Sequence, residues 1–309
     1  MENDRMGKVA ILGVFVADTA YRASRMPKMG ETILGNSFVL GPGGKGSNQA
    51  VAAGNLGADV TIITRLANDD FGKMATQTWD NANVKGAVKY SANSYTGAAF
   101  IFIDDKTGNN AIIIAPGAAS EISLKDIHEN SNVISSADVF LTQLEQPIEV
   151  AQEGLKIAKE HGKITILNPA PAVHLPKEIF GLCDFITPNE TEAEAITGLP
   201  VRNHKEAETA AKYLNDLGVK TPIITMGDQG AFLHGHGLIP ALNVGKVVET
   251  TGAGDAFNGG FAVALSEGKS SLEAVKFGCA TASISVTRAG TAPSMPAREE
   301  VEKILLILE

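Results

Sequence analysis

The sequence predicts an α/β fold, in which helices cover both faces of a central, mostly parallel sheet and a small second β-sheet is inserted into the chain. Between residues 139 and 226, short apolar runs typical of strands alternate with runs of helical periodicity, as expected for a parallel sheet. Before that region, apolar runs at 98–103 and 111–114 flank DDKTG, a clear hairpin signal. We therefore expect one domain over residues 1–309, with inserted strands at about 19–40 and 88–115.

The composition argues against two classes of partner. A formal net charge of −9 and a pI near 5.2 disfavour binding to nucleic acid or to an anionic membrane surface. Residues 1–6 carry no apolar signal region, and no apolar run approaches membrane-spanning length. These features predict a cytoplasmic protein in which Cys183 and Cys279 are reduced, buried thiols, although the sequence also allows a disulfide between them.

The first half of the chain begins with a strand and then loses helical periodicity. We expect strands at residues 8–12, 32–34, 37–40, 60–66, 98–103 and 111–114, and helices at 51–56 and 70–82. The short runs at 32–34 and 37–40 indicate extended structure after a turn. They are expected to join the later hairpin in the inserted sheet.

The second half alternates between strands and helices. We expect strands at residues 139–141, 164–167, 185–187 and 222–226, and helices at 147–161, 190–197 and 207–217. Another apolar helical run begins at residue 256, and two further helices are predicted at 271–287 and 297–308. A short polar loop at 288–294 separates the last two.

Residues 41–50, GPGGKGSNQA, form a glycine-rich stretch that leads into a helical run. The stretch is not a Walker A loop, because Lys45 is followed by Gly46 rather than by Ser or Thr. Glycine lets a ligand approach the backbone closely, while Lys45 and Asn48 supply a positive charge and a two-faced amide suited to adjacent sugar hydroxyls. A ligand loop is therefore expected here, with a plain flexible turn as the alternative.

A second glycine-rich stretch, ETTGAGDAFN at residues 249–258, opens a helix. A glycine turn at a helix start directs unpaired N–H groups and the positive end of the helix dipole at one point, which is a natural anion site. Asp255 lies at that point. It either caps the helix by accepting N–H bonds or acts as a general base beside a transferring phosphoryl group.

Polar residues also follow predicted strands at the point where each strand ends. Asp18 comes after the first strand, Glu145 and Asn168 follow two later strands, and NETE at 189–192 follows a fourth. Each can be a helix cap or a turn residue. Their recurrence at equivalent strand ends favours a shared ligand site, because ligands of open α/β sheets collect at the carboxyl ends of the strands.

Together, the two glycine-rich stretches resemble the signatures of the ribokinase-like (PfkB) family of carbohydrate kinases. GGKGSNQA at residues 43–50 matches the first signature and TTGAGDAF at 250–257 matches the second, with QLE, NPAPA and PNETE between them in the family's order. The resemblance covers essentially the whole chain and implies a Rossmann-like fold. It also implies ATP-dependent phosphorylation of the primary hydroxyl of a small sugar, with D-ribose, giving D-ribose 5-phosphate, as the first expectation.

The resemblance assigns roles to matching positions. Asp255 would take the proton from the primary hydroxyl, and the N–H groups of Gly252, Ala253 and Gly254 would form an anion hole for the γ-phosphoryl group. Sugar-contacting positions are matched by Asp18, Gly43, Gly44, Lys45, Asn48, Glu145 and Asp255. Positions that line the ATP site are matched by Asn189, Thr225, Met226, Gly227, Asp228, Gln229, Gly230, Gly254 and Cys279.

The same resemblance implies two cations and a dimer. Glu192 completes the pattern associated with Mg²⁺, which it would hold indirectly. A monovalent cation, K⁺, would be held by an acidic side chain and main-chain carbonyls at Glu249, Thr251, Ser285, Arg288, Gly290 and Ser294. The inserted strands would form a lid over the sugar, and the lids of two subunits would clasp to make a homodimer.

Two positions depart from the family's pattern. Val16 stands two residues before Asp18, where ribose-specific members usually carry an asparagine, and Glu249 replaces the usual aspartate of the cation site. Valine cannot hydrogen-bond a sugar hydroxyl, so a kinase of another pentose, hexose, polyol or nucleoside is one alternative. A non-catalytic sugar-binding relative is a second, against which the intact glycine frame around Asp255 argues.

Overall fold

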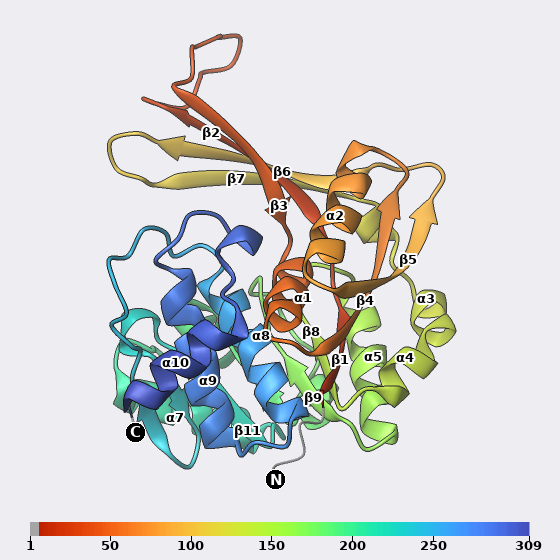
Figure 1. Cartoon of the computed structure of the whole chain (residues 1–309), viewed down its shortest axis with the longest axis vertical. Helices are drawn as coiled ribbons and strands as arrows, with labels where there is room; N and C mark the ends of the chain where they lie inside the picture. Colours follow the sequence, from red (N-terminus) through yellow and green to blue (C-terminus); the bar gives the residue numbers. More distant parts are fainter. Residues whose placement is uncertain (1–5, 309) are drawn as a thin grey trace.

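The computed structural model describes residues 6–308, which fold around a large sheet with a smaller sheet projecting from it (Figure 1). The expectation that the N-terminus carries no apolar signal region rests partly on residues 1–5, which lie outside the described residues. Within residues 6–308 the main sheet has nine strands, in the order β13-β12-β11-β10-β9-β8-β1-β4-β5. Their bounds are β1 (Lys8–Leu12), β4 (Asp59–Ala67), β5 (Val84–Ser91), β8 (Val139–Thr142), β9 (Ile164–Leu167), β10 (Phe185–Ile186), β11 (Thr221–Thr225), β12 (Ala231–Leu233) and β13 (Gly237–Ile239).

The strands from β11 to β5 pair in parallel, and β12 and β13 add an antiparallel edge beside β11. This confirms the predicted mostly parallel sheet. The two antiparallel strands were not expected, because three-residue strands are too short to show a period in the sequence.

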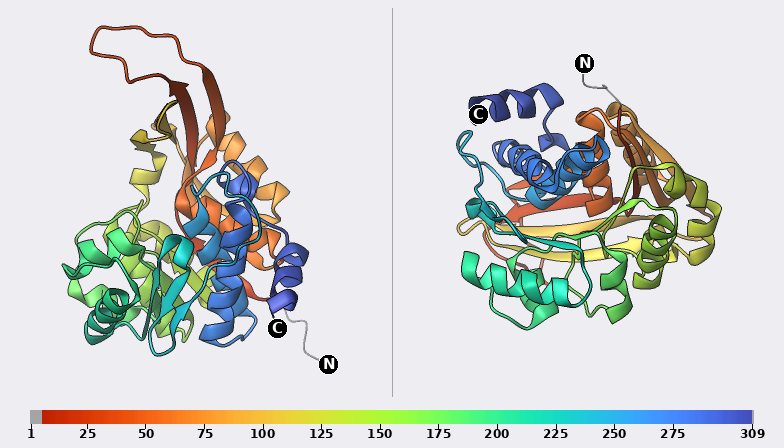
Figure 2. Two further views of the ribbon diagram at one scale, coloured as in Figure 1. Left: turned by 90° about the vertical axis from the view of Figure 1, so that its left-hand side faces the viewer. Right: turned by 90° about the horizontal axis from the view of Figure 1, so that it is seen from below.

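Helices lie on both faces of the main sheet, as predicted (Figure 2). One face carries α1 (Lys45–Asn55), α2 (Asp70–Asn81), α8 (Ala253–Ser266), α9 (Ser271–Ser285) and α10 (Arg298–Leu308). The other carries α3 (Leu124–Glu129), α4 (Ser131–Ser136), α5 (Ile148–Glu160), α6 (Glu190–Thr197) and α7 (His204–Asp216). Short 3₁₀ turns lie at η1 (Ala118–Glu121), η2 (Lys177–Leu182), η3 (Gly227–Gln229) and η4 (Ala292–Ser294).

Helix α8 is buried along almost its whole length, because it lies between α1, α9 and the main sheet. Every residue from Asp255 to Ser266 is buried, and apart from Asp255, Asn258 and Ser266 the helix consists of apolar residues and glycine, as expected for an enclosed helix. Gly259 allows close approach to α1, since a Cβ there would lie 2.5 Å from the Cβ of Ala52. The packing fixes the start of α8 rigidly against the start of α1.

The smaller sheet consists of β2 (Val16–Ala23), β3 (Ser37–Gly43), β6 (Thr96–Asp104) and β7 (Asn110–Gly117), in the order β3-β2-β6-β7. It extends away from the main body as an arm (Figures 1 and 2). We call these four strands the lid sheet. They confirm the inserted sheet, but β5, part of which falls within the predicted 88–115 insert, pairs with β4 in the main sheet instead.

Two local predictions were wrong, and Asp18 does not occupy the turn that the sequence left open as an alternative. Residues 32–34 are irregular rather than a strand, and Leu34 is 94% exposed, because this segment extends past the sheet and has no partner strand. The glycine-rich stretch is helical from Lys45 onward rather than a loop up to residue 50. Asp18 lies in the middle of β2, paired between β3 and β6, rather than in a turn.

Both cysteines are free and buried, which confirms the predicted thiols. Across residues 6–308, no helix combines the length and the apolar character needed to cross a bilayer.

Candidate active site

The site is built around the start of α1, which the first glycine signature shapes. Gly44 caps the helix with φ of 89°, a left-handed conformation that favours glycine, and a Cβ there would lie 2.5 Å from the carbonyl oxygen of Val14. The Lys45 N–H donates to Oε2 of Glu145 at 2.8 Å. A Cβ on Gly43 would clash with the carboxylate of Asp18. The glycines therefore let two carboxylates from other elements approach the start of α1.

The start of α8 provides the second half of the site. Gly252 is its N-cap, with φ of 84°, and no side chain caps the helix. Asp255 is 7% exposed, and its carboxylate accepts from two side-chain amides of α1: Asn48 Nδ2 on Oδ2 and Gln49 Nε2 on Oδ1, each at 3.0 Å. This geometry replaces the helix-cap interpretation of Asp255. The Ala253 N–H donates to the carbonyl of Thr250 at 3.2 Å, a turn contact that a bound anion would share or replace.

Several buried carboxylates lie close together in this region, and their pKa values are raised. Burial, followed by the charges of Asp255 and Glu249, raises the pKa of Asp18 to about 6. Burial raises the pKa of Glu145 to about 7 against the opposing effect of Lys45, and burial also raises the pKa of Asp255. Burial disfavours the charged form of Lys45, but Asp255, Glu145 and Glu192 together hold its pKa above the usual value. Lys45 therefore stays cationic among acids that take up protons readily.

A small cavity of about 140 Å³ joins the starts of α1 and α8. Its walls include Lys45, Asp255, Gly252 and Gly254, together with Glu192 from α6. Asn189, Thr225, Asn168, Thr187, Asn258 and Ala170 complete it. A positive side chain, a helix N-terminus and a buried carboxylate thus face one small polar space, an arrangement suited to an anion beside a proton acceptor.

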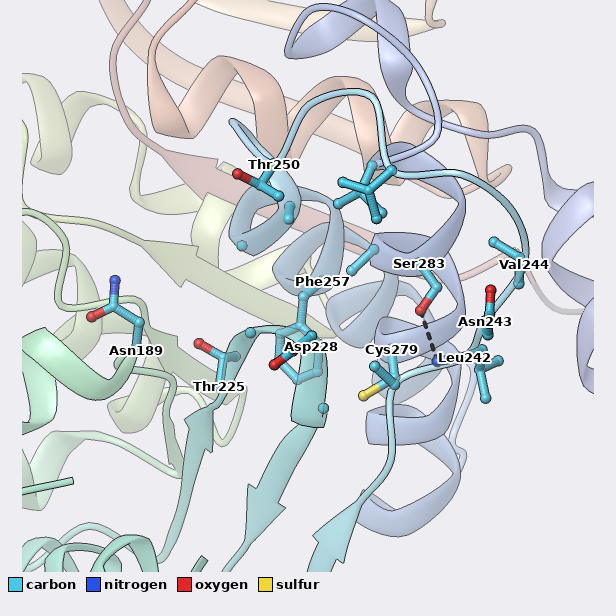
Figure 3. A pocket seen from close by; sticks show the side chains of 18 of the residues that line it. Asn189, Thr225, Asp228, Leu242, Asn243, Val244, Thr250, Phe257, Cys279 and Ser283 are labelled. Carbon is cyan, nitrogen blue, oxygen red and sulfur yellow. Dashed lines mark hydrogen bonds between the residues drawn. The ribbon is translucent and has the colours of Figure 1, made fainter. Parts of the chain in front are cut away.

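A larger cavity of about 700 Å³ adjoins the first, with Asn189, Thr225 and Gly254 in both walls (Figure 3). Of the predicted ATP-site positions, Asn189, Thr225, Gly227, Asp228, Gly230, Gly254 and Cys279 line it. Met226 and Gln229 are absent from its lining; Met226 is 1% exposed and packs in a core cluster with residues of α6 and α7. Alternation along the strand explains this, because Met226 points to the opposite side from Thr225.

The sequence interpretation missed one wall of this cavity. Residues 241–245, Val247, Thr250 and Phe257 line it, along with Ala282, Ser283 and Val286 of the α9 region. The Leu242 N–H donates to Ser283 Oγ at 3.0 Å, a contact that holds the 241–247 segment against α9 (Figure 3). This segment is neither helix nor strand, so no periodicity marked it.

Glu192 is held in place by a capping box at the start of α6. Its Oε2 accepts from the Asn189 N–H at 2.9 Å, while Asn189 Oδ1 accepts from the Glu192 N–H at 2.8 Å. Within the described residues, no group of three or more His, Cys, Asp or Glu side chains is arranged to hold a metal ion. A divalent ion here would therefore need ligands from water or from a bound phosphate.

Of the predicted cation-site residues, Glu249 and Gly290 are in direct contact. Glu249 Oε2 accepts from the Gly290 N–H at 2.8 Å, and the carbonyl of Val286 accepts from the N–H groups of Val248 and Glu249. The Arg288 guanidinium turns away to pair with Glu300. The Arg288 N–H donates to Ser285 O at 3.1 Å and the Ser294 N–H donates to Thr291 O at 3.1 Å, so both lie in tight turns. The structure gives no contact for the side chain of Thr251.

Comparisons with known proteins agree with this geometry. The family model described as pfkB family carbohydrate kinase matches residues 6–298. The chain is 39% identical over 301 residues to the ribokinase of Haemophilus influenzae, covering 96% of this chain and 98% of that protein. It is 34% identical to the deoxyribokinase of Salmonella typhi, covering 97% and 99%.

Solved structures give the same result. The structure of Arabidopsis thaliana ribokinase complexed with ribose and ATP superposes with a TM-score of 0.90 at 32% identity, over 97% of this chain and 99% of that one. Sequence signatures, sheet topology and these matches over nearly the full length agree. This chain belongs to the pfkB family of carbohydrate kinases.

Proposed function

We propose that the protein transfers the γ-phosphoryl group of ATP to the primary hydroxyl of D-ribose, giving D-ribose 5-phosphate and ADP. The observation that carries the proposal is the position of Asp255. Its buried carboxylate faces the same small cavity as Lys45 and the start of α8, and a cavity of about 700 Å³ adjoins it. The similarity to ribokinases, one of them solved with ribose and ATP, supports the choice of substrates.

In this proposal Asp255 is the general base. As the sugar hydroxyl oxygen bonds to the γ-phosphorus, its proton passes to Asp255 and the bond from phosphorus to the β,γ-bridging oxygen breaks, releasing ADP. Hydrogen bonds from Asn48 and Gln49 orient the carboxylate and favour its ionised form against the effect of burial, which raises its pKa. Lys45 and the N–H groups of Gly252, Ala253 and Gly254 stabilise the charge on the transferring group, which is the main demand of phosphoryl transfer.

The sugar would lie between the start of α1 and β2. Asn48 Oδ1 is buried and has no hydrogen-bond partner among residues 6–308, so a sugar hydroxyl would satisfy it. Asp18 and Glu145 supply acceptors, Lys45 supplies a donor, and Gly43 and Gly44 allow the close approach of backbone and ligand. The lid sheet, which contains Asp18 in β2, would cover the sugar and limit access of water, which competes as a phosphoryl acceptor.

ATP would lie in the larger cavity. Leu242, Val244, Val247, Phe257, Cys279 and Val286 offer apolar surface for the base, and Asn189, Thr225, Gly227, Asp228 and Gly230 lie on the opposite wall. The phosphates would extend through the shared wall at Gly254 into the smaller cavity. This arrangement matches pockets that bury an apolar group and orient it with a few polar ones.

The residues present fit Mg²⁺ and K⁺, which we include in the proposal. Glu192, one of whose carboxylate oxygens is held by the Asn189 N–H, would hold Mg²⁺ through water, and the ion would neutralise phosphate charge. Glu249 with main-chain groups at Thr251, Ser285, Arg288, Gly290 and Ser294 would hold K⁺. The contact between Glu249 and Gly290 shows that the two segments already meet.

We further propose a homodimer formed through the lid sheet. Large apolar side chains are exposed on it, namely Tyr21, Phe38, Val39, Leu40, Ile112, Ile113 and Ile114, with Ile113 65% exposed. Alternation along the strands puts Tyr21, Phe38, Leu40 and Ile113 on one face of the lid sheet, and Val39, Ile112 and Ile114 on the face that carries Asp18. Exposed apolar side chains gathered on one face of a sheet indicate an interaction site. A cytoplasmic location also belongs to the proposal, and the two free thiols agree with it.

A deoxy-pentose is the second candidate substrate, because of Val16. It is 5% exposed, pairs with Gly43 across β2 and β3, and lies on the same face of β2 as Asp18, two residues along. An apolar side chain at this place suits a sugar lacking a hydroxyl there. The similarity to deoxyribokinases at 34% identity supports this alternative.

ADP release with a panel of sugars tests the proposal. Ribose, 2-deoxyribose, other pentoses, hexoses, polyols and nucleosides are supplied with ATP and Mg²⁺, and kcat/KM is compared. We expect the highest value for ribose or 2-deoxyribose, with a 5-phosphate as product. No turnover of any compound would refute the kinase function, and a preference for a hexose or a nucleoside would refute the pentose assignment.

A further inference from the structure

Behind the Asp255 carboxylate, a closed series of hydrogen bonds runs through four elements. Gln49 Nε2 donates to Asp255 Oδ1 at 3.0 Å and to Asn168 Oδ1 at 3.1 Å. Asn168 Nδ2 then donates to the carbonyl of Thr187 at 3.1 Å, and Thr187 Oγ1 donates to Asn258 Oδ1 at 2.7 Å. Asn258 Nδ2 donates to the carbonyl of Gly254 at 2.8 Å, and Gly254 is bonded to Asp255. We call this series the polar ring.

Every amide in the polar ring has only one orientation that satisfies its neighbours. Gln49 Nε2 faces two acceptors, Asp255 Oδ1 and Asn168 Oδ1, and its Oε1 accepts from Gln143 Nε2. The opposite orientation would place Oε1 against the carboxylate, with repulsion between acceptors. Because Gln49 is fully buried, water cannot replace a lost partner. The direction of donation toward Asp255 is therefore fixed by the fold.

The polar ring connects the proposed base with the proposed anion hole. Gln49 comes from α1, Asn168 follows β9, Thr187 follows β10, and Asn258 lies one turn into α8. Gly254, where the ring closes, belongs to the start of α8 that would bind the γ-phosphoryl group. A change at any member should therefore reach both the carboxylate of Asp255 and the backbone at Gly254.

We propose that Gln49 and Thr187 are positioning residues that act through the polar ring to orient the Asp255 carboxylate and to keep it ionised for proton acceptance. The inference rests on the proposed role of Asp255 as base. It adds that α1 contributes Gln49 to the chemistry, besides the residues that face the sugar. It also adds that Thr187, which makes no bond to Asp255, affects the Asp255 carboxylate through Asn258 or Asn168.

The proposal also accounts for the cost of so many buried polar groups. Gln49, Thr187 and Asn258 are at most 1% exposed, and Asn168 is 6% exposed. Asn168, Thr187 and Asn258 also form part of the wall of the smaller cavity, whereas Gln49 does not line it. Orientation of a catalytic group is a demand that apolar residues cannot meet.

Titration of the Asp255 carboxyl carbon tests the proposal directly. Protein with ¹³C-labelled aspartate is followed by NMR against pH, and the Asp255 resonance is identified by its loss in Asp255→Asn. Gln49→Met removes both donors at similar volume. We expect it to raise the titration midpoint by about one pH unit, because a charge-assisted hydrogen bond to the ionised form is lost. The acid limb of the kcat profile against pH should move upward by the same amount, so the loss of kcat grows to about tenfold on that limb, with little change in sugar KM.

Two substitutions of Thr187 test its hydroxyl separately from its volume. Thr187→Val deletes only the hydroxyl bond to Asn258, and we expect a smaller rise of the midpoint and a loss of kcat, while Thr187→Ser should restore both. Thr64→Val is the matched control. Thr64 is 3% exposed in β4 and its hydroxyl has no hydrogen-bond partner in the described part of the chain, so the midpoint and kcat should stay at wild-type values. Lys45 on α1, Asp18 on β2, Glu145 after β8 and Glu192 on α6 also act on Asp255 by charge, and all variants keep them.

Two results would overturn the proposal that Gln49 and Thr187 position Asp255 through the polar ring. One is a Gln49→Met protein with the wild-type midpoint and kcat, and the other is Thr187→Val behaving as Thr64→Val does. If Gln49→Met does not fold, the Thr187 pair still decides the outcome. If the wild-type protein phosphorylates no sugar, the proposed function fails, but the midpoint of Asp255 still tests whether the ring holds it ionised.

Discussion

Asn48 Nδ2 donates to Asp255 Oδ2 at 3.0 Å, although 207 positions separate the two residues. The bond joins the two glycine-rich signatures, which open α1 and α8, into a single site. Close packing between Gly259 and Ala52 holds the two helices in this register. Asp255 is therefore accessible from the small cavity but immobile, which are the two properties that a general base needs.

Replacing Asp255 by Asn should abolish most of the activity without unfolding the protein. The amide is nearly isosteric with the carboxylate, but it cannot accept the proton, so we expect kcat to fall by about 10²-fold or more. Steady-state kinetics with ADP detection measures the loss, and nucleotide binding by calorimetry serves as the control for folding. A kcat close to that of the wild-type protein would leave Asp255 with a structural role only.

Sugar binding should weaken as the pH falls. The pKa values of Glu145 and Asp18 are raised to about 7 and about 6, so these carboxyls are ionised above that range and take up protons within it. A protonated carboxyl loses acceptor capacity for sugar hydroxyls. Affinity is therefore complete only well above pH 7 and falls as the pH drops, first through about 7 and then through about 6.

The measurement is sugar KM between pH 5 and 8.5 at saturating ATP. Glu145→Gln should remove the change of sugar KM near pH 7, and Asp18→Asn should remove the change near pH 6. A KM that stays constant over this range in the wild-type protein would show that neither carboxyl needs its charge to bind the sugar.

Much of the fold could be predicted because the second half of the chain has strong periodicity, as in α5 and α7. The site was harder to predict. Lys45 and Asn48 were recognised, but the glycines around them looked like a loop, whereas Gly44 is an N-cap and α1 starts directly after it. A glycine with positive φ can precede a helix, as Gly44 does, or follow one, as Gly198 does, so the residue type alone does not tell which.

Other parts of the site depend on tertiary contacts alone. Gln49 reaches Asp255 only because α1 and α8 pack together, and no local pattern distinguishes it from Gln146, another buried glutamine. Likewise, the 241–247 segment becomes a cavity wall because Ser283 of α9 binds the Leu242 N–H. Pairings of this kind lie beyond any local window of sequence.

Activity should depend on a monovalent cation. Glu249 and the turn at Gly290 meet beside the start of α8, so a bound K⁺ would order the anion hole without contacting the sugar. We expect kcat to rise with K⁺ and less with Na⁺, and to be lowest in tetramethylammonium. Glu249→Gln should weaken activation, while Glu302→Gln on the surface of α10 should not. Equal rates in K⁺ and tetramethylammonium would contradict the cation site.

The lid sheet should hold two subunits together. Ile113→Lys places a charge in the exposed apolar surface, and we expect a shift toward monomer in sedimentation together with a higher sugar KM, because a lid without its partner covers the sugar less well. Leu306→Lys is the control, since Leu306 is 72% exposed on α10, away from the lid. If the wild-type protein sediments as a monomer at micromolar concentration, the dimer proposal fails.

Val16 decides which pentose fits best. It lies on the face of β2 that carries Asp18, so a ribose hydroxyl placed against it would lose its hydration without gaining a partner. That loss costs about 1–3 kcal/mol, or one to two decades in affinity. We expect Val16→Asn to lower the KM for ribose by about tenfold with little change in kcat, because the recovered contact is present equally before and during the reaction. The KM for 2-deoxyribose should rise or stay the same, so the ratio of kcat/KM for the two sugars reports the contact itself.

Val16→Ala, which removes bulk without adding a donor or acceptor, separates the effect of polarity from the effect of space. A ribose KM that improves equally in both variants would assign the effect to space, and one that improves in neither would place Val16 away from the sugar.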